Sequence, residues 1–252
     1  MKKILALVLT ICLAITCMFA ITSCGPKGKL VVGITDYKPM DYKDADGNWI
    51  GFDAELAQMF AEEMNLECEF VEITWSKKVA EVNAGEIDLI WNGMTASDEL
   101  GQEIDFSIKY ARNAQVLVAK KGANIDKDNL ANLVIAVENG SAGDDTATAL
   151  TPKQVNRVEA QVDALVEVLS GNSDAAMIDL TMASSVVGKE EYADLEIVEG
   201  AEYGNEEFAV GMKKGSEYQA KLNEFFKAKY ADNTLQTLAE KYGVVINEAA
   251  FN

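Results

Sequence analysis

From residue 29 onward, short apolar runs alternate with longer segments in which apolar residues recur at helical spacing. The strand-like runs are 29–36, 67–75, 87–91, 115–120, 133–139, 174–179 and 207–213. The helix-like segments are 51–65, a short one from Ser76, 141–150, 161–172, a short one after 179, one near 218–226 and a last one near 235–242. Such alternation is typical of a largely parallel α/β sheet covered by helices. The pattern therefore predicts an α/β fold.

Local signals predict where some of these elements begin and end. Asp53 is placed to cap the helix of 51–65, and Gly85 is placed to end the short helix that follows. Successive side chains of a strand point to opposite faces of the sheet. We therefore expect Trp91 to pack beneath the sheet while its neighbour Asn92 faces the other way.

The N-terminus has the composition of an export signal rather than of a folded domain. Lys2 and Lys3 precede a nearly uniform aliphatic run over residues 4–20. The run then leads into Ile21-Thr22-Ser23-Cys24-Gly25, which resembles the lipobox of bacterial lipoproteins. An uncleaved membrane anchor is the alternative, since about 20 apolar residues can span a bilayer. The resemblance implies a signal peptide over 1–24, lipid on Cys24, and an extracytoplasmic protein anchored to the bacterial cell membrane.

Cysteine usage agrees with export. Cys12 and Cys17 would leave with the signal and Cys24 would carry the lipid, so Cys68 alone would remain in the mature chain. No disulfide can then form within it. Cys68 lies in the predicted strand 67–75 and is interpreted as a buried thiol rather than a reactive one.

Charge and composition exclude several classes of function. The 252 residues include 41 acidic and 22 basic side chains, a formal net charge of −19, and no histidine. A nucleic-acid-binding protein needs a basic surface, which this chain lacks. Without histidine, the chain can form neither a Ser-His-Asp or Cys-His catalytic set nor a zinc site with histidine ligands.

Polar and small residues gather at three predicted strand ends. These are Asn92-Gly93-Met94-Thr95, Gly140-Ser141-Ala142-Gly143 and Asp179. Open α/β sheets bind ligands in the crevice at the carboxyl ends of their strands. Each segment taken alone is also typical of an ordinary turn or helix cap. None is a Walker or GxGxxG loop, so the residues by themselves indicate an exported α/β protein with a polar crevice.

Short motifs along the chain occur in the order found in one family. In the first half they are Thr35-Asp36-Tyr37, Pro39, Gly47, Gly51-Phe52-Asp53, Leu56, Trp75, Gly85, Ile87-Asp88 and Gly93-Met94-Thr95. In the second half they are Asp105-Phe106-Ser107, Tyr110, Asn139-Gly140-Ser141, Gly171, Asp174-Ala175, Asp179 and Lys241-Tyr242-Gly243. From about residue 29 to 243, the chain resembles the solute-binding proteins of polar amino acid ABC transporters, family 3 of the bacterial extracellular solute-binding proteins.

This resemblance implies a periplasmic-binding-protein-like fold, in which two α/β lobes are joined by two crossing hinge strands. Lobe 1 would comprise residues 25–113 plus 208–252, and lobe 2 residues 114–207. The implied function is that of a monomeric, non-enzymatic protein without cofactor or metal. It would capture a small polar solute, an amino acid or a related amine or amide, and deliver it to an ABC permease.

The resemblance also implies which residues form the site. Tyr37 would cover the ligand, Trp75 would form a cleft wall, and Asp179 would pair with the ligand's α-ammonium. The strand-end residues would contribute further contacts, and they are Asn92, Gly93, Thr95 and Ser141. For Tyr37 and Trp75, packing in the core is the alternative interpretation.

Two positions depart from the family's pattern. Leu100 stands where an arginine usually grips the α-carboxylate, and Ala142 stands where many relatives have Ser or Thr. Removing one partner of a buried charge pair costs roughly 2–5 kcal/mol, so an ordinary amino acid should bind weakly unless another cation substitutes. Lys109 and Arg112 are candidates, although we expect both to point to the surface. The pattern therefore favours an amine, an amide or a cationic solute over a zwitterion.

Two other functions stay open at this point. Some members of this fold family are dehydratases with an acid in the cleft, a role that Glu99 or Asp98 would take here. Alternatively, Leu100 and Ala142 permit a receptor or scaffold that no longer binds any solute. Turnover of a candidate compound identifies the enzyme, while absence of any ligand-induced stabilisation identifies the scaffold.

Overall fold

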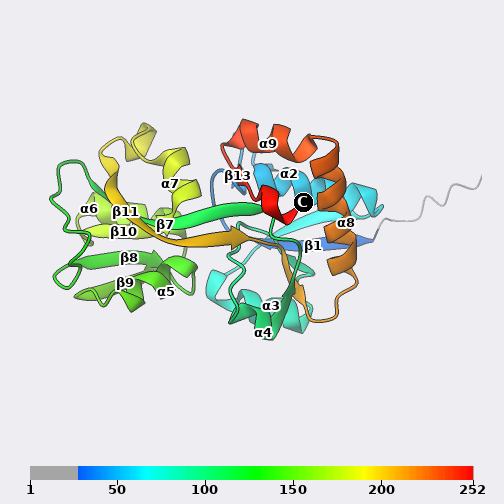
Figure 1. The fold of residues 1–252 in the computed structure, drawn as a ribbon, viewed down its shortest axis with the longest axis horizontal. Coiled ribbons are helices and arrows are strands. Elements are labelled where there is room, and N and C mark those ends of the chain that lie inside the picture. The colour runs from blue at the N-terminus through cyan, green and yellow to red at the C-terminus, as the bar shows by residue number, and fades with distance from the viewer. Residues whose placement is uncertain (1–27, 252) are drawn as a thin grey trace, which may run out of the picture.

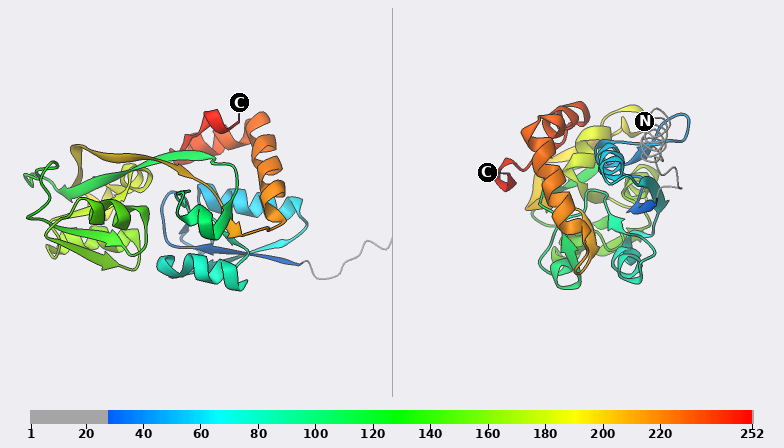
Figure 2. Two further views of the ribbon diagram at one scale, coloured as in Figure 1. Left: turned by 60° about the horizontal axis from the view of Figure 1, so that its bottom comes forward. Right: turned by 90° about the vertical axis from the view of Figure 1, so that its right-hand side faces the viewer.

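The computed structural model describes residues 28–251, which form two lobes connected by two long strands (Figure 1). These strands are β7 (Ala111–Lys120) and β11 (Leu195–Phe208), which pair antiparallel with each other. Figure 2 shows from a second direction that both run from one lobe into the other. The predicted two-lobed α/β fold with two crossing strands is confirmed, while the boundaries at 113/114 and 207/208 stay a prediction.

The expected signal peptide and Cys24 lie outside the described residues. Within residues 28–251, none of the helices has the length and apolar character needed to cross a bilayer.

The first lobe is built on a five-stranded sheet of order β4-β1-β5-β12-β6. Its strands are β1 (Lys29–Ile34), β4 (Glu67–Glu72), β5 (Leu89–Ile90), β6 (Ile104–Phe106) and β12 (Gly211–Lys213), with a separate hairpin of β2 (Tyr42–Lys43) and β3 (Trp49–Ile50). Its helices are α2 (Phe52–Glu63), η2 (Trp75–Lys77), α3 (Lys78–Ala84), α4 (Leu100–Glu103), α8 (Tyr218–Ala231) and α9 (Thr234–Tyr242). Strand β1 runs parallel to β4 and β5, whereas β12 is antiparallel to β5 and β6.

Alternation along β1 explains why helices cover both faces of this sheet. Val32 belongs to the same buried cluster as Phe60 of α2 and Phe226 of α8. Its neighbour Val31 packs instead against the cluster that contains Val82 of α3. Because both faces of the strand are apolar, each face buries its side chains only when a helix covers it.

The second sheet has the order β11-β7-β10-β8-β9, and β13 pairs with the first residues of β7. Its remaining strands are β8 (Val134–Glu138), β9 (Gln154–Val158), β10 (Ala175–Asp179) and β13 (Val245–Ile246). Its helices are α5 (Ala142–Ala149), α6 (Gln161–Ser170) and α7 (Leu180–Val186). Ile135 and Met177 cluster with Ala147 of α5, whereas Ala136 and Ile178 cluster with α6 and α7. The alternation therefore places α5 on one face of the sheet and α6 with α7 on the other.

Two local predictions are confirmed. Gly85 ends α3 in the left-handed region, with φ of 78°. Trp91 is fully buried beneath the first sheet, where its ring meets those of Phe60, Phe225 and Phe226.

Other strand predictions are incomplete. The run 207–213 is not one strand, because Phe208 ends β11 and Gly211 begins β12. Residues 195–206 of β11 are absent from the strand-like runs of the sequence, although the family resemblance implied a second crossing strand. It is rich in Glu and Gly, and its pairing with β7 contains two register shifts, so it shows no regular apolar alternation.

The prediction that Asp53 caps α2 is wrong. Gly51 occupies the cap position, and no side chain caps the helix. Asp53 is fully buried instead, where its carboxylate accepts hydrogen bonds from the backbone N–H of Gly93 at 2.7 Å and the hydroxyl of Tyr110 at 2.8 Å. Burial raises the pKa of Asp53 to about 7. The residue therefore ties α2 to the segment that follows β5.

We expect Asp53→Ala to lower the free energy of unfolding by about 3 kcal/mol, because it leaves two buried donors without an acceptor. Asp46→Ala is the matched control, since Asp46 is exposed in the β2–β3 turn and should change stability by less than about 0.5 kcal/mol. Urea unfolding of the two variants measures both values. Equal losses would contradict the structural role of Asp53.

Candidate functional site

A cavity of about 170 Å³ lies between the lobes, at the carboxyl ends of β5, β8 and β10. The structure brings together all the residues predicted for ligand binding, since each lines this cavity. They are Tyr37, Trp75, Asn92, Gly93, Thr95, Ser141 and Asp179. Segments separated by up to 142 positions in the sequence thus meet at one place, as expected for the crevice of an α/β sheet.

The two aromatic residues form walls of the cavity. Tyr37 is 2% exposed and lies edge-on to Phe208, with ring centroids 6.5 Å apart. Within residues 28–251 its hydroxyl has no hydrogen-bond partner, and burial together with nearby Asp179 raises the pKa of Tyr37 well above its usual value. Trp75 is also buried, and the ammonium of Lys78 lies 4.6 Å from its ring centroid. Both rings therefore shape the cavity while belonging to the packed interior.

The side chain of Asn92 is used within the protein. Its Oδ1 accepts the backbone N–H of Thr35 at 3.0 Å and the Thr35 hydroxyl at 2.7 Å. Its Nδ2 donates to the Thr35 carbonyl at 3.1 Å and to Asp41 at 2.7 Å. Asn92 therefore holds the end of β5 against the end of β1, and this makes the floor of the cavity rigid.

Gly93 and Thr95 continue this floor. Gly93 has φ of 54°, and a Cβ there would lie 2.6 Å from the Tyr37 ring. A side chain at this position would displace the aromatic wall. Thr95 donates its hydroxyl to Glu206 of β11 at 3.1 Å, so it links the first lobe to a connecting strand.

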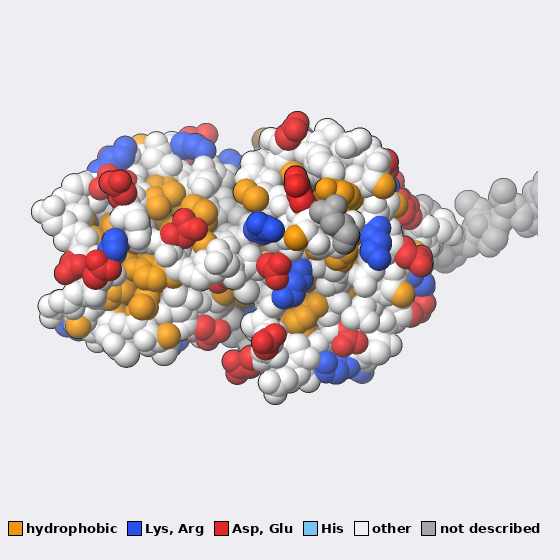
Figure 3. Space-filling view, in the orientation of Figure 1, with side chains coloured by type: hydrophobic (Ala, Val, Ile, Leu, Met, Phe, Trp, Pro, Cys, Tyr) orange, Lys and Arg blue, Asp and Glu red, His pale blue; other side chains and the backbone are white. Residues whose placement is uncertain are grey.

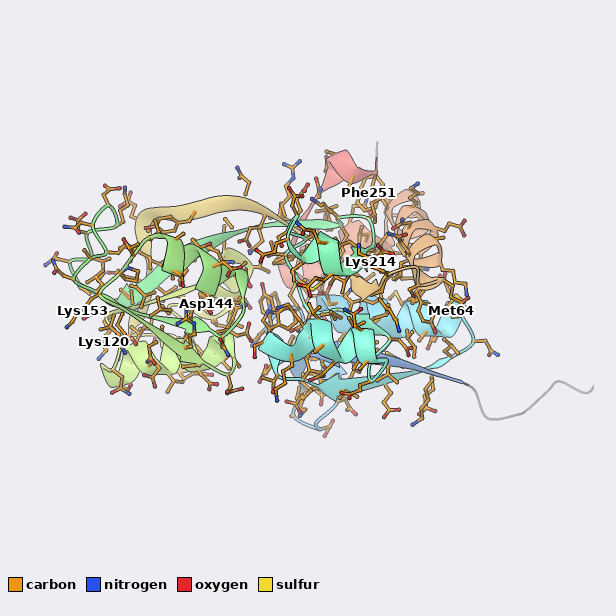
Figure 4. The ribbon with its side chains drawn as sticks, turned by 90° about the horizontal axis from the view of Figure 1, so that it is seen from below. Met64, Lys120, Asp144, Lys153, Lys214 and Phe251 are labelled. Carbon is orange, nitrogen blue, oxygen red and sulfur yellow. The ribbon has the colours of Figure 1, made fainter. Side chains whose placement is uncertain are left out.

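Helix α5 begins at the cavity. Ser141 caps it, because the Ser141 hydroxyl accepts the backbone N–H of Asp144 at 3.1 Å. Asp144 in turn accepts the N–H of Gly140 at 3.1 Å and pairs with Arg157 at 2.8 Å. Figure 4 labels Asp144 in the lobe that also carries Lys120. These bonds order the loop between β8 and α5, where it forms the cavity wall.

Asp179 is a buried carboxylate of the site that accepts several hydrogen bonds. It is 4% exposed, and its carboxylate accepts hydrogen bonds from the side-chain amides of Gln115 at 2.7 Å, Asn113 and Gln161. The amide nitrogens of Asn113 and Gln115 also donate to Glu206, at 2.9 and 3.0 Å. Burial and the charge of Glu206 raise the pKa of Asp179 to about 7. Neutral amides orient this carboxylate, but they do not neutralise its charge.

Acidic side chains dominate the cavity. Within the described part of the chain, its lining includes five carboxylates and one cation, which are Glu99, Glu103, Glu138, Asp145, Asp179 and Lys78. On the face shown in Figure 3, acidic and basic side chains are interspersed over both lobes. The excess of negative charge in the cavity has the same sign as the net charge of the whole chain, which is −19.

The structure places Leu100 in the cavity wall, where the family pattern has arginine. Neither predicted substitute lines the cavity. Lys109 pairs with Glu207 at 2.9 Å, and Arg112 donates to Asn247 at 3.1 Å. Both are partly exposed, as predicted.

Lys78 is the cation that the sequence prediction missed. Its side chain is 6% exposed, and its ammonium donates to the carbonyl of Gly140 in the other lobe at 2.8 Å. Burial lowers the pKa of Lys78 to about 8. A usable signal existed, because Lys78 follows Trp75 by three positions and so shares its side of the helix.

Metal and thiol chemistry find no support in residues 28–251. No cluster of three or more His, Cys, Asp or Glu side chains there is arranged to hold a metal ion. Cys68 lies half-buried on β4, and burial raises its pKa to about 12. Its thiol is therefore neutral and unreactive at ordinary pH, while the predicted burial is only partial.

Comparison with known proteins places the chain among binding proteins. The sequence profile of bacterial extracellular solute-binding proteins, family 3, matches residues 30–245. The arginine-binding extracellular protein ArtP of Bacillus subtilis is 28% identical, over 96% of this chain and 98% of that protein. The histidine-binding periplasmic protein of Salmonella typhimurium is 31% identical, over 96% and 97%. A solved structure of an ancestral arginine-binding protein bound to arginine has a TM-score of 0.79 at 26% identity, covering 86% of this chain and 99% of that one.

The raised pKa of Asp179 predicts how stability depends on pH in the protein without solute. Its contribution to the free energy of unfolding is full below 3.8 and is lost as the pH rises through about 7. In the wild type, this titration makes the free energy of unfolding fall by up to about 1.4 kcal/mol per pH unit. Asp179→Asn has no proton to release at this position, so its free energy of unfolding should not show this fall. Urea unfolding of both proteins from pH 4 to 8 measures the difference. Coincident slopes would show that Asp179 keeps its ordinary pKa.

Proposed function

Because the chain belongs to the bacterial extracellular solute-binding proteins of family 3, we propose that it captures a small polar solute with an amine group and delivers it to an ABC permease. Its solute would be an amino acid or a related amine or amide. The relatives are named for binding rather than for catalysis, and the chain is a binding protein, not an enzyme. Of the two acids considered for a dehydratase, Glu99 lines the cavity and Asp98 does not.

One observation carries this proposal. Asp179 is buried in the cavity wall with its carboxylate held by three amides, and no Lys or Arg among residues 28–251 forms an ion pair with it. A buried charge without an ionic partner destabilises a protein, so a cationic group from outside would be bound strongly there. Ammonium groups suit this position, because each donates several charge-assisted hydrogen bonds.

The cavity offers fewer partners to the α-carboxylate of an ordinary amino acid. Leu100 and Ala142 replace the groups expected at the α-carboxylate, and Glu99 and Asp145 add negative charge to the lining. Lys78 is the one cation that the described lining offers to a carboxylate. An amine or amide therefore fits the cavity at least as well as a zwitterion.

We further propose that the protein works as a monomer outside the cytoplasm, anchored to the cell membrane by lipid on Cys24. The basic start, the aliphatic run and the lipobox-like segment of the sequence support this proposal. The two relatives are named as extracellular and periplasmic proteins, which agrees with export. A tether of this kind would keep the captured solute close to the permease.

A thermal-shift screen against amino acids, amines, amides and short peptides tests solute capture. A ligand present at 100 times its Kd adds about 2.7 kcal/mol, so we expect the Tm to rise by about 5–10 °C. Asp179→Ala should abolish the rise in Tm. Asp126→Ala should preserve it, because Asp126 is exposed and lies outside the cavity lining. An unchanged Tm with every compound would contradict solute capture and support the scaffold interpretation.

A labelling experiment tests the anchor. Cells that produce the wild-type chain should incorporate radioactive palmitate into it and retain it in the membrane fraction. Cys24→Ser removes the thiol that would receive the lipid, so label and membrane retention should both disappear. Cys68→Ser is the matched control and should keep both. Membrane retention of the Cys24→Ser protein would point instead to the uncleaved apolar run as the anchor.

A further inference from the structure

Glu138 is a second buried carboxylate in the cavity wall that the family pattern does not explain. It is the last residue of β8 and is 3% exposed. Among residues 28–251, its Oε1 atom has no hydrogen-bond partner. A buried carboxylate oxygen without a donor is costly, so its presence beside a cavity calls for a physical reason.

The position of Glu138 brings it close to Asp179. Strands β8 and β10 are parallel neighbours, with Ala136 opposite Ala176 in the register. Glu138 and Asp179 are the final residues of these two strands, so their carboxylates lie at the same edge of the sheet and line the same cavity. Burial, and next the charge of Asp179, raise the pKa of Glu138 to about 8.

The protein's own cation does not pair with this carboxylate. Lys78 lies near enough to favour the ionised form of Glu138, but its ammonium donates to the carbonyls of Gly140 at 2.8 Å and Trp75 at 3.4 Å. No ion pair joins Lys78 to Glu138 in the described part of the chain. The donors that Glu138 needs would therefore come from the cavity itself.

We propose that Glu138 is a second cation-binding group, so that the captured solute carries a second positive group besides the amine bound at Asp179. This inference rests on the proposed function. It names the solute class as diamines and amino acids with an amine or guanidinium side chain. A guanidinium would suit Glu138 well, because it offers a planar pair of N–H donors to a carboxylate.

A solute whose second group is neutral leaves Glu138 without a charged partner. Loss of one partner of a buried charge pair weakens binding by roughly 30-fold or more. The site therefore selects by charge at this position, and size alone does not determine which solute binds.

Isothermal titration of the full lipoprotein in mild detergent tests this selection with two matched pairs. Arginine is compared with citrulline, its neutral isostere, and putrescine is compared with 1-butylamine. In the wild-type protein, arginine should bind about 30-fold more tightly than citrulline, or putrescine about 30-fold more tightly than 1-butylamine, because only arginine and putrescine carry two cationic groups. Glu138→Gln should remove that preference while leaving the Kd of the neutral partner unchanged or lower.

Glu240→Gln is the control, because Glu240 is exposed on α9 and does not line the cavity, and it should change each Kd by less than about threefold. Equal binding of both members of each pair by the wild type would overturn the role of Glu138 and leave the proposed function intact. Equal weakening of both members by Glu138→Gln would also overturn it, since that result indicates a structural role. If the protein binds neither pair and no compound of the wider screen, the inference and the proposed function are overturned together.

Discussion

The carboxylate of Asp179 is the group on which the rest of this structure depends. It accepts hydrogen bonds from Asn113 and Gln115 of β7, and the same two amides bind Glu206 of β11. Glu206 also accepts the hydroxyl of Thr95 from the first lobe. A single hydrogen-bonded network therefore runs from the cavity into both connecting strands and across to the other lobe. Under the proposed function, an amine bound at Asp179 would contact the network that reaches both connecting strands.

In the first lobe, the buried carboxylate of Asp53 holds the segment that lines the opposite side of the cavity. Asp53 binds the backbone of Gly93, and Gly93 leaves room for the ring of Tyr37. The first lobe thus presents a rigid wall, whereas the second lobe presents Glu138 and Asp179, with which no Lys or Arg of residues 28–251 forms an ion pair. Under the proposed function, this asymmetry gives one cavity both a defined shape and a site for cationic groups.

Much of this could be predicted from the sequence, for reasons that differ between elements. The apolar spacing of α2 predicts its buried side chains Phe52, Leu56 and Phe60, and the residues implied by the family resemblance all line the cavity. Asp53 was assigned to a helix cap because a local pattern cannot show a partner 40 positions away. Lys78 and Glu138 were missed for a similar reason. The contact of Lys78 with the carbonyl of Gly140 forms only when the two lobes meet, although its spacing from Trp75 was a usable signal. Glu138 lines the cavity beside Asp179 because β8 and β10 are neighbours in the sheet, and no spacing within β8 alone encodes that pairing.

The central claim is that Asp179 binds the cationic amine of a captured solute. Its most direct test is a crystal structure of the protein with the solute that gives the largest thermal shift. We expect a solute nitrogen within about 2.7–3.2 Å of the Asp179 carboxylate, with the bonds from Gln115 and Gln161 retained. A solute bound in the cavity with its amine elsewhere, and with water or a neutral group at Asp179, would contradict it.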